Sequence, residues 1–181
     1  MSTTEFDAIV LGAGAAGLMC AAIAGQRGRR VLLLDHADQV GKKILISGGG
    51  RCNFTNVNTA PDRFISANPH FAKSALARYT PADFVALVDR YGIAYHEKTL
   101  GQLFCDGSAK QIVAMLLEEA ANGGVDVRTG QPVRDVTHAD AKFTVRFGDA
   151  SFSAPALVIA TGGPSIPQMG ATGFAYDLAR Q

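Results

Sequence analysis

One glycine motif restricts the fold of this 181-residue chain more than any other feature. The sequence fits G-x-G-x-x-G at Gly12, Gly14 and Gly17, directly after an apolar run from Phe6 to Leu11. The apolar run predicts a buried strand, and the small and apolar residues after the motif predict a helix from about Ala15. In this context the first glycine makes a tight turn, the second lets phosphates approach the backbone, and the third permits close helix packing.

A second apolar run, Val31 to Leu34, completes a β-α-β unit of about 30 residues. The right-handed crossover rule places its two strands side by side. Asp35 ends the second strand at the position where an acid can bind a ribose hydroxyl. Because this carboxylate would repel a 2'-phosphate, NADP is disfavoured here, while FAD and NAD both stay open.

The rest of the chain predicts an α/β, Rossmann-like three-layer fold around a parallel sheet. We expect a polar, glycine-rich loop over Gly41–Asn56, and helices over Pro69–Ala77, Pro81–Tyr91 and Ser108–Asn122. The runs Lys142–Phe147 and Ala150–Phe152 predict an inserted antiparallel β-hairpin or meander, followed by a buried strand over Ala156–Ala160.

Composition disfavours several classes of protein. Seventeen basic and sixteen acidic side chains give a net charge of +1, which provides no field suited to nucleic acid or an anionic membrane. The uncharged stretch from Ala8 to Gly25 is long enough for a membrane helix, but its four glycines fit a strand, turn and helix better. We expect a cytoplasmic protein with a small-molecule substrate; its oligomeric state is left open.

Three scattered cysteines fit neither a disulfide framework nor a zinc site, and the four histidines lack metal-ligand spacing. We therefore predict no metal site. Cys52 has two interpretations: a thiolate stabilised by the neighbouring Arg51, or a packed thiol. The second is favoured because no other cysteine follows closely, and Cys20 and Cys105 are expected to be buried.

The loop after the β-α-β unit is predicted to contact a ligand. Three consecutive glycines, Gly48 to Gly50, expose backbone N–H groups, and Lys42, Lys43 and Arg51 flank them. A flexible basic surface loop would not need serine, glycine, arginine and asparagine so close to the apolar residues 44–46.

The same stretch, Gly-Lys-Lys-Ile-Leu-Ile-Ser-Gly-Gly-Gly-Arg-Cys-Asn at residues 41–53, resembles the signature of the BaiN-like, aminoacetone-oxidase-like family of bacterial FAD-dependent flavoproteins. Two further motifs, His96–Cys105 and Ala160–Pro167, carry the resemblance, which covers nearly the whole chain. Family members are much longer, so residues 1–181 correspond to the N-terminal part of an FAD-binding domain, without the substrate domain and the C-terminal return of the FAD domain.

The resemblance implies which residues lie at FAD. The glycine turn would hold the pyrophosphate, Asp35 the adenosine ribose, and the loop from Lys42 to Asn53 would run toward the flavin. Val133 is similar to a position whose backbone borders the adenine. The expected cofactor residues are Gly12, Gly14, Ala15, Ala16, Gly17, Asp35, His36, Lys42, Lys43, Ser47, Gly48, Gly49, Gly50, Arg51, Asn53, Val133, Thr161, Gly162 and Gly163.

The implied function is that of an FAD-dependent oxidoreductase that transfers a hydride between FAD and a nicotinamide or small organic substrate, with NAD(P)H as a possible electron donor. The catalytic residues are not identified by the sequence. Two alternatives remain: an FAD-binding fragment or module without turnover of its own, and an NAD-dependent dehydrogenase.

Overall fold

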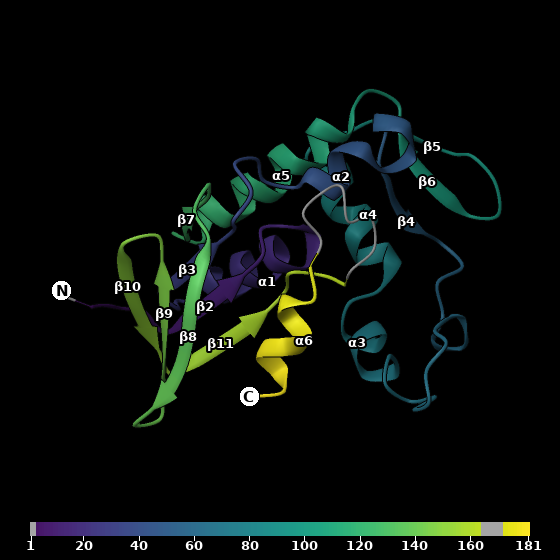
Figure 1. Cartoon of the computed structure of the whole chain (residues 1–181). Helices are drawn as coiled ribbons and strands as arrows, with labels where there is room; N and C mark the ends of the chain where they lie inside the picture. The colour runs from purple at the N-terminus through teal and green to yellow at the C-terminus, as the bar shows by residue number, and fades with distance from the viewer. Residues whose placement is uncertain (1–2, 164–171) are drawn as a thin grey trace. The chain divides into compact units, whose positions relative to one another are not determined.

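The computed structural model of the chain describes residues 3–163 and 172–181 (Figure 1). Residues 164–167 of the third family-like motif lie outside this part of the chain. The chain divides into two compact units, one made of Met1–Lys43 with Leu116–Gln181 and the other of Ile44–Met115. We describe each unit by itself.

The first unit is built on a four-stranded parallel sheet with the order β11-β2-β3-β7. The strands are β2 (Ala8–Leu11), β3 (Val31–Leu34), β7 (Asp126–Arg128) and β11 (Ala156–Ile159). The helix α1 (Ala15–Gln26) connects β2 to β3, and these strands pair in parallel from Ala8 opposite Val31 to Leu11 opposite Leu34. The predicted β-α-β unit is therefore confirmed.

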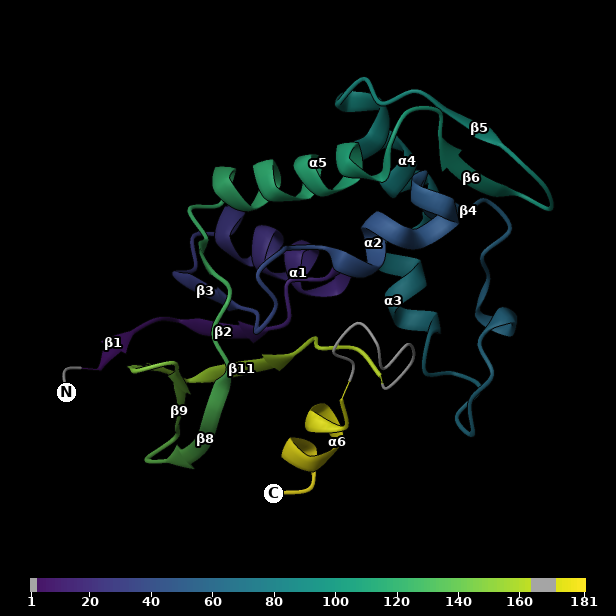
Figure 2. The same cartoon turned by 45° about the horizontal axis from the view of Figure 1, so that its top comes forward.

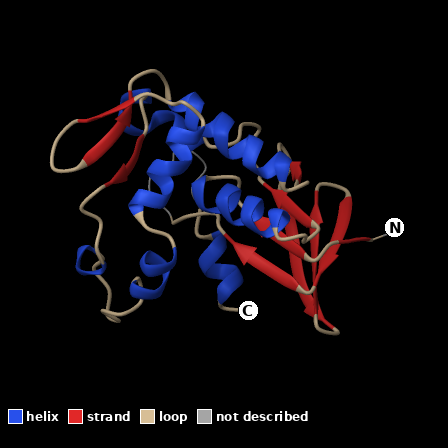
Figure 3. Cartoon of the chain, turned by 180° about the vertical axis from the view of Figure 1, so that it is seen from behind, coloured by secondary structure: helices blue, strands red, loops and turns tan. Residues whose placement is uncertain are grey.

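An antiparallel meander forms a second layer of the same unit. It consists of β8 (Val133–Ala139), β9 (Lys142–Phe147) and β10 (Ala150–Ala154), and β1 (Thr4–Glu5) joins its edge in parallel with β10. The predicted pairing across Gly148 and Asp149 is confirmed, because β9 and β10 pair from Phe147 opposite Ala150 onward. In Figure 3, which shows the chain from behind, these strands are among those drawn in red near the label of the N-terminus.

The core of the first unit lies between the two sheets. Ile9, Leu11, Leu32 and Leu34 from the parallel sheet pack with Val145, Phe147, Phe152 and Ala154 from the meander. Side chains alternate along a strand, so Val10 and Leu33 point to the opposite face, where α1 contacts β2 and β3. The result is the expected Rossmann-like three-layer fold with a parallel and an antiparallel sheet.

Two glycines allow α1 to approach the end of α5 (Ala109–Asn122). Figure 2 shows the two helices beside each other. A Cβ atom on Gly25 would overlap the carbonyl oxygen of Gly123, so neither helix end could come as close with larger residues. The side chain of Gln26 also donates to the carbonyl oxygen of Glu119 at 3.0 Å. The short α6 (Phe174–Ala179) packs Phe174 against the core between the sheets.

The second unit contains a three-stranded antiparallel sheet and short helices. Its strands are β4 (Asn53–Asn56), β5 (Tyr95–Glu97) and β6 (Gln102–Cys105), in the order β4-β6-β5. The chain enters the unit through α2 (Lys42–Ile46). The further helical segments are η1 (Ser47–Gly50), η2 (Pro61–Arg63), α3 (Lys73–Arg78) and α4 (Pro81–Arg90). The predicted loop over Gly41–Asn56 was thus wrong: that stretch contains a helix, a 3₁₀ turn and a strand.

The two proline-opened helices had different outcomes. Pro81 does begin α4, where Thr80 and Asp83 form a reciprocal capping box. Pro69 does not begin a helix, because the Asn68 side chain accepts the backbone N–H of His70 at 3.0 Å and α3 starts only at Lys73. Such side-chain bonds compete with helix formation.

No helix within residues 3–163 and 172–181 has the length and apolar character needed to cross a membrane. The uncharged stretch over Ala8–Gly25 forms β2, the glycine turn and most of α1 instead.

Candidate functional site

The turn between β2 and α1 depends on Gly12. Its φ angle is +104°, a conformation that favours glycine, and a Cβ atom there would lie 2.6 Å from the carbonyl oxygen of Ala160 and 2.8 Å from Cα of Thr161. The end of β2 and the chain after β11 therefore come together. The predicted neighbours Gly12 and Thr161 share this edge of the parallel sheet.

Gly14 is the N-cap of α1, and its surroundings are open. A Cβ atom added there would have no atom within 4 Å, and the N-cap makes no side-chain hydrogen bond. The first turn of α1 contains no acidic residue. The first N–H groups of a helix have no intrahelical acceptor, so those of Ala15, Ala16 and Gly17 suit an anion.

Gly17 has the packing role that the motif requires. A Cβ atom on Gly17 would overlap the carbonyl oxygen of Gly12 and approach the Ala160 side chain at 3.4 Å. The three glycines of the motif thus have three different environments: a turn, an open space and a close helix contact. This combination fits a diphosphate at the N-terminus of α1. Among residues 3–163 and 172–181 there is no cluster of side chains that could hold a metal ion.

Asp35 joins the end of β3 to the glycine turn. Its Oδ2 accepts the backbone N–H of Ala13 at 2.6 Å, and its Oδ1 accepts that of Ala37 at 2.8 Å. The His36 ring lies 3.5 Å from Oδ1 and is mostly exposed. Each carboxylate oxygen has two lone pairs, so Asp35 can support the turn and still accept a ribose hydroxyl.

The two lysines of α2 have different neighbours. Lys42 forms an ion pair with Asp38 at 2.9 Å, and this hydrogen bond holds the pKa of the Asp38 carboxyl below its usual value. The Lys43 ammonium lies 3.8 Å from the position that a Cβ atom on Gly162 would occupy. Lys43 and Gly162 are therefore neighbours, as expected for residues of one site.

The remaining predicted positions of the first unit lie at its edges. Val133 is at the start of β8, pairs with Phe147 and packs against the core between the sheets. Gly163 lies near Tyr176, since a Cβ atom there would come within 3.4 Å of the tyrosine hydroxyl. The proposed contact of Val133 with an adenine concerns its backbone and stays a prediction.

The second unit contains the other predicted cofactor residues, from Ser47 to Asn53. Gly48, Gly49 and Gly50 all have φ between +59° and +85°, which explains the run of three glycines. A Cβ atom on Gly48 would lie 2.6 Å from the Phe104 ring, whereas one on Gly49 would meet nothing within 4 Å. Arg51 and Asn53 are exposed.

Two buried thiols, those of Cys52 and Cys105, lie close to this turn. Burial raises the pKa of the Cys52 thiol, and a hydrogen bond with Ser47 offsets part of that rise. Burial, followed by the proximity of Cys52, raises the pKa of Cys105 to about 11. Both groups are therefore neutral thiols at neutral pH, in agreement with the packed-thiol interpretation of Cys52.

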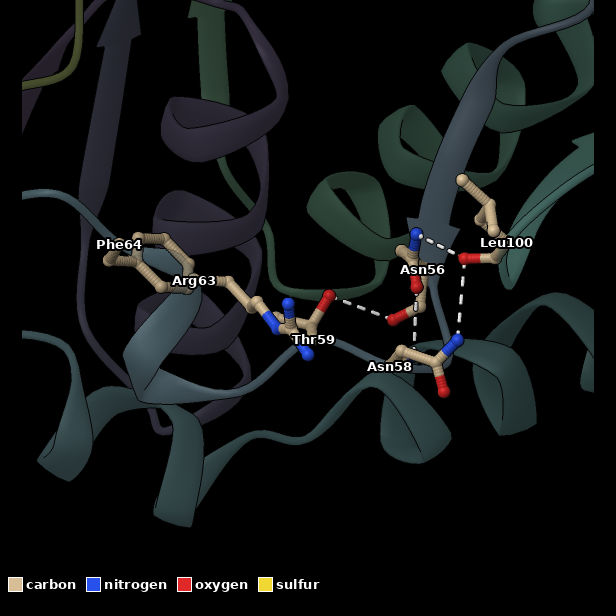
Figure 4. A pocket seen from close by; sticks show the side chains of 6 residues that line it. All are labelled: Asn56, Asn58, Thr59, Arg63, Phe64 and Leu100. Carbon is tan, nitrogen blue, oxygen red and sulfur yellow. Dashed lines mark hydrogen bonds between the residues drawn. The ribbon is translucent and has the colours of Figure 1, made fainter.

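The sequence did not predict a cavity of about 700 Å³ in the second unit. Figure 4 shows its lining: Asn56, Asn58, Thr59, Arg63, Phe64 and Leu100. The cavity combines segments separated by some 40 residues, the chain after β4 and the turn before β6, so spacing along the chain gives no signal for it. The only visible hint was a polar stretch with one aromatic residue beside an arginine.

Comparisons with known proteins agree with this geometry. Residues 6–181 match the family described as the HI0933-like protein Rossmann domain. The chain is 55% identical over 98% of its length to the ribosomal RNA dihydrouridine synthase of Escherichia coli K12, of which it covers 44%. It is 29% identical over 94% of its length to the 3-dehydro-bile acid delta(4,6)-reductase of Clostridium scindens, of which it covers 42%.

Solved structures share the fold at low sequence identity. THI4 of Thermovibrio ammonificans matches 89% of this chain and 58% of its own, with a TM-score of 0.56 and 15% identity. The halogenase PltM in complex with phloroglucinol and FAD matches 91% of this chain and 36% of its own, with a TM-score of 0.52 and 18% identity.

Proposed function

This chain belongs to the HI0933-like family of Rossmann domains, and from that membership we propose that it is the FAD-binding part of a flavin-dependent oxidoreductase. The chain spans less than half the length of the curated relatives described above. The oxidoreductase activity is therefore a proposal, and so is the use of NADH or NADPH as the electron donor.

The open space at Gly14 carries the proposal. An uncapped helix N-terminus beside a glycine without neighbours can accept a pyrophosphate, and Asp35 lies next to it through its bond to Ala13. Backbone N–H groups would bind the phosphates, and the Asp35 carboxylate would orient the adenosine ribose. When bound, FAD supplies hydride-transfer chemistry.

The relatives' names favour one class of reaction. Dihydrouridine differs from uridine by saturation of a carbon–carbon double bond conjugated to a ring carbonyl. A 3-dehydro-bile acid delta(4,6)-reductase likewise acts on double bonds conjugated to a ketone. We propose that the protein reduces a double bond of this type: a hydride adds to the β-carbon and a proton to the α-carbon.

The identity of 55% to an enzyme named for ribosomal RNA favours a uridine within RNA as the substrate. The nearly neutral composition had favoured a small molecule. An assay on RNA transcribed in vitro separates the two, since a reduced uridine gains two hydrogens and is detected by mass spectrometry of the digested RNA.

The central test is the cofactor. The purified chain is denatured, and the released compound is identified by its absorbance and mass. We expect FAD in the parent protein and none in Gly14→Val, because the valine side chain fills the space at the N-terminus of α1. Release of NAD, or equal FAD content in both proteins, would overturn the proposal.

A further inference from the structure

One wall of the cavity in the second unit is held together by hydrogen bonds. The side-chain amides of Asn56 and Asn58 both donate to the carbonyl oxygen of Leu100, at 3.0 and 3.3 Å. The backbone N–H of Val57 donates to Gly101 at 2.9 Å. These bonds fasten the chain after β4 to the turn before β6, so they fix the position of this wall in the absence of a ligand (Figure 4).

One wall of the cavity presents an aromatic ring that the chain leaves partly uncovered. The Phe64 residue is 41% exposed, and Phe71 contacts it edge-on with ring centroids 6.1 Å apart. Leu100, which is 86% exposed, lines the opposite side. The edge-on contact orients the Phe64 ring and leaves surface for a planar partner, because aromatic and heterocyclic rings stack on such a ring.

The polar groups of the cavity match a nucleotide. Arg63 is the only charged residue among the described residues of the lining, and its side chain is 70% exposed. Its one ion pair within the described residues is a long contact of 3.7 Å between Nε and Asp62. The Thr59 hydroxyl donates to the carbonyl oxygen of Asn56 and the Asn58 amide to that of Leu100, so their side-chain oxygen atoms can still accept a bond from a sugar or from the edge of a base.

Local charge differs from the average over the chain. Between residues 51 and 79 the sequence has four basic side chains, Arg51, Arg63, Lys73 and Arg78, and one acidic side chain, Asp62. The net charge of +1 for the whole chain hides this basic segment. A cavity of about 700 Å³ is also within the size range of roughly 300–1,000 Å³ found for ligand sites.

We propose that this cavity holds one unpaired nucleotide of a single-stranded RNA, with its base stacked on Phe64 and its phosphate bound by Arg63. The inference rests on the proposed RNA substrate and assigns residues that would bind the RNA. A purely apolar ligand would leave the Arg63 guanidinium without a function in the cavity.

Binding of a fluorescently labelled, uridine-rich single-stranded RNA to the purified chain tests the proposal. Phe64→Leu keeps an apolar side chain but removes the ring, and we expect it to weaken binding by about fivefold or more. Arg63→Gln should weaken binding and reduce the slope of log Kd against log salt concentration by about 0.7.

Two controls match these changes. Ile65→Ala alters the fully exposed apolar neighbour of Phe64, and Arg134→Gln removes an exposed arginine from β8 of the other unit. Both should bind the RNA like the parent. Unchanged affinity in Phe64→Leu, or equal losses in the controls, would overturn the proposal, and circular dichroism shows whether each variant is folded.

The FAD content of the same samples separates this inference from the proposed function. If the chain retains FAD while Phe64→Leu binds RNA normally, only the cavity assignment fails. If no FAD is found but Phe64→Leu and Arg63→Gln lose RNA selectively, the cavity assignment stands and the flavin proposal fails.

Discussion

Gly14 and Gly17 belong to one motif, but alanine should destabilise the protein much more at Gly17 than at Gly14. In Gly14→Ala the new methyl group meets no atom of the chain, so the free energy of unfolding should change by about 1 kcal/mol or less. In Gly17→Ala it overlaps the Gly12 carbonyl oxygen, and we expect a loss of about 1–3 kcal/mol. Urea denaturation of both variants measures the difference.

The same pair separates binding from stability. Gly14→Ala should weaken FAD binding by about tenfold or more, a loss of about 1.4 kcal/mol, while the protein stays folded. A variant that keeps its stability and its FAD affinity would show that the open space at Gly14 is not used by the cofactor. Titration of the apoprotein followed by flavin fluorescence gives the affinity.

Cys105 should make the protein less stable in alkali. Its pKa is raised by burial from 9.0 to about 11, so the folded thiol keeps its proton where the unfolded thiol loses it. Between about pH 9 and 11 the unfolded state therefore binds fewer protons, and the free energy of unfolding falls as pH rises. Below pH 9 this contribution is complete.

Replacement by alanine removes this titration. Cys105→Ala should have a flatter dependence of stability on pH between 9 and 11, although the variant is less stable overall because a fully buried side chain is truncated. Cys20→Ala provides the control, because Cys20 is only partly buried. Parallel pH profiles for the parent and Cys105→Ala would contradict the assignment.

At the scale of a residue, the position of Asp35 could be predicted from the sequence, but its hydrogen bonds could not. Its place after an apolar strand and its distance from the glycines predicted an acid beside the turn. The two backbone N–H groups that it accepts, from Ala13 and Ala37, depend on how the chain after β3 folds back. No pattern along the chain encodes that contact, so its support of the turn was visible only in the structure.

At the scale of an element, the 3₁₀ turn η1 depends on its contact with β6. Gly48 and Gly49 both have positive φ, so alanine at either position is strained. Only at Gly48 does the methyl group also meet the Phe104 ring, at 2.6 Å. We expect Gly49→Ala to cost about 1 kcal/mol and Gly48→Ala to cost at least about 1 kcal/mol more, measured by chemical denaturation.

A truncation of the ring tests the cause. In the background Phe104→Leu, which has no ring at the place of contact, the difference between the two alanine variants should shrink. An unchanged difference would assign the extra loss to the backbone rather than to the packing of η1 on β6.

Elements marked by an apolar run or a repeated pattern were predicted well, and elements without such a signal were not. The strands β2 and β3 and the helices α1, α4 and α5 follow apolar runs or periodicity with clear start and stop residues. The helix α2 has five residues, too few for a helical period, and its glycine-rich continuation resembled a loop. The strand β5 has three residues and is defined by its partner β6.

At the scale of the whole molecule, the predicted cofactor residues fall into two units. The first unit brings together the glycine turn, Asp35 and the segment around Thr161, and it places Lys43 beside Gly162. The turn from Ser47 to Asn53 belongs to the second unit. From the sequence, the residues of the two units were assigned to one site, because the family-like motif continues without interruption from Lys42 to Asn53.

Hydrogen exchange with and without FAD tests whether the glycine turn and the turn from Ser47 to Asn53 bind the same cofactor. Saturation at a hundredfold excess over Kd should stabilise the protein by about 2.7 kcal/mol and slow exchange at residues 12–18 and 35–37. If the turn from Ser47 to Asn53 faces the flavin, its amides are protected at the same FAD concentration, and we expect this result. Protection at 12–18 with an unchanged rate at 47–53 would retain the pyrophosphate site and remove the turn from it. Gly14→Val should abolish both effects, because loss of the phosphates removes the anchor on which any contact of the turn with the flavin depends.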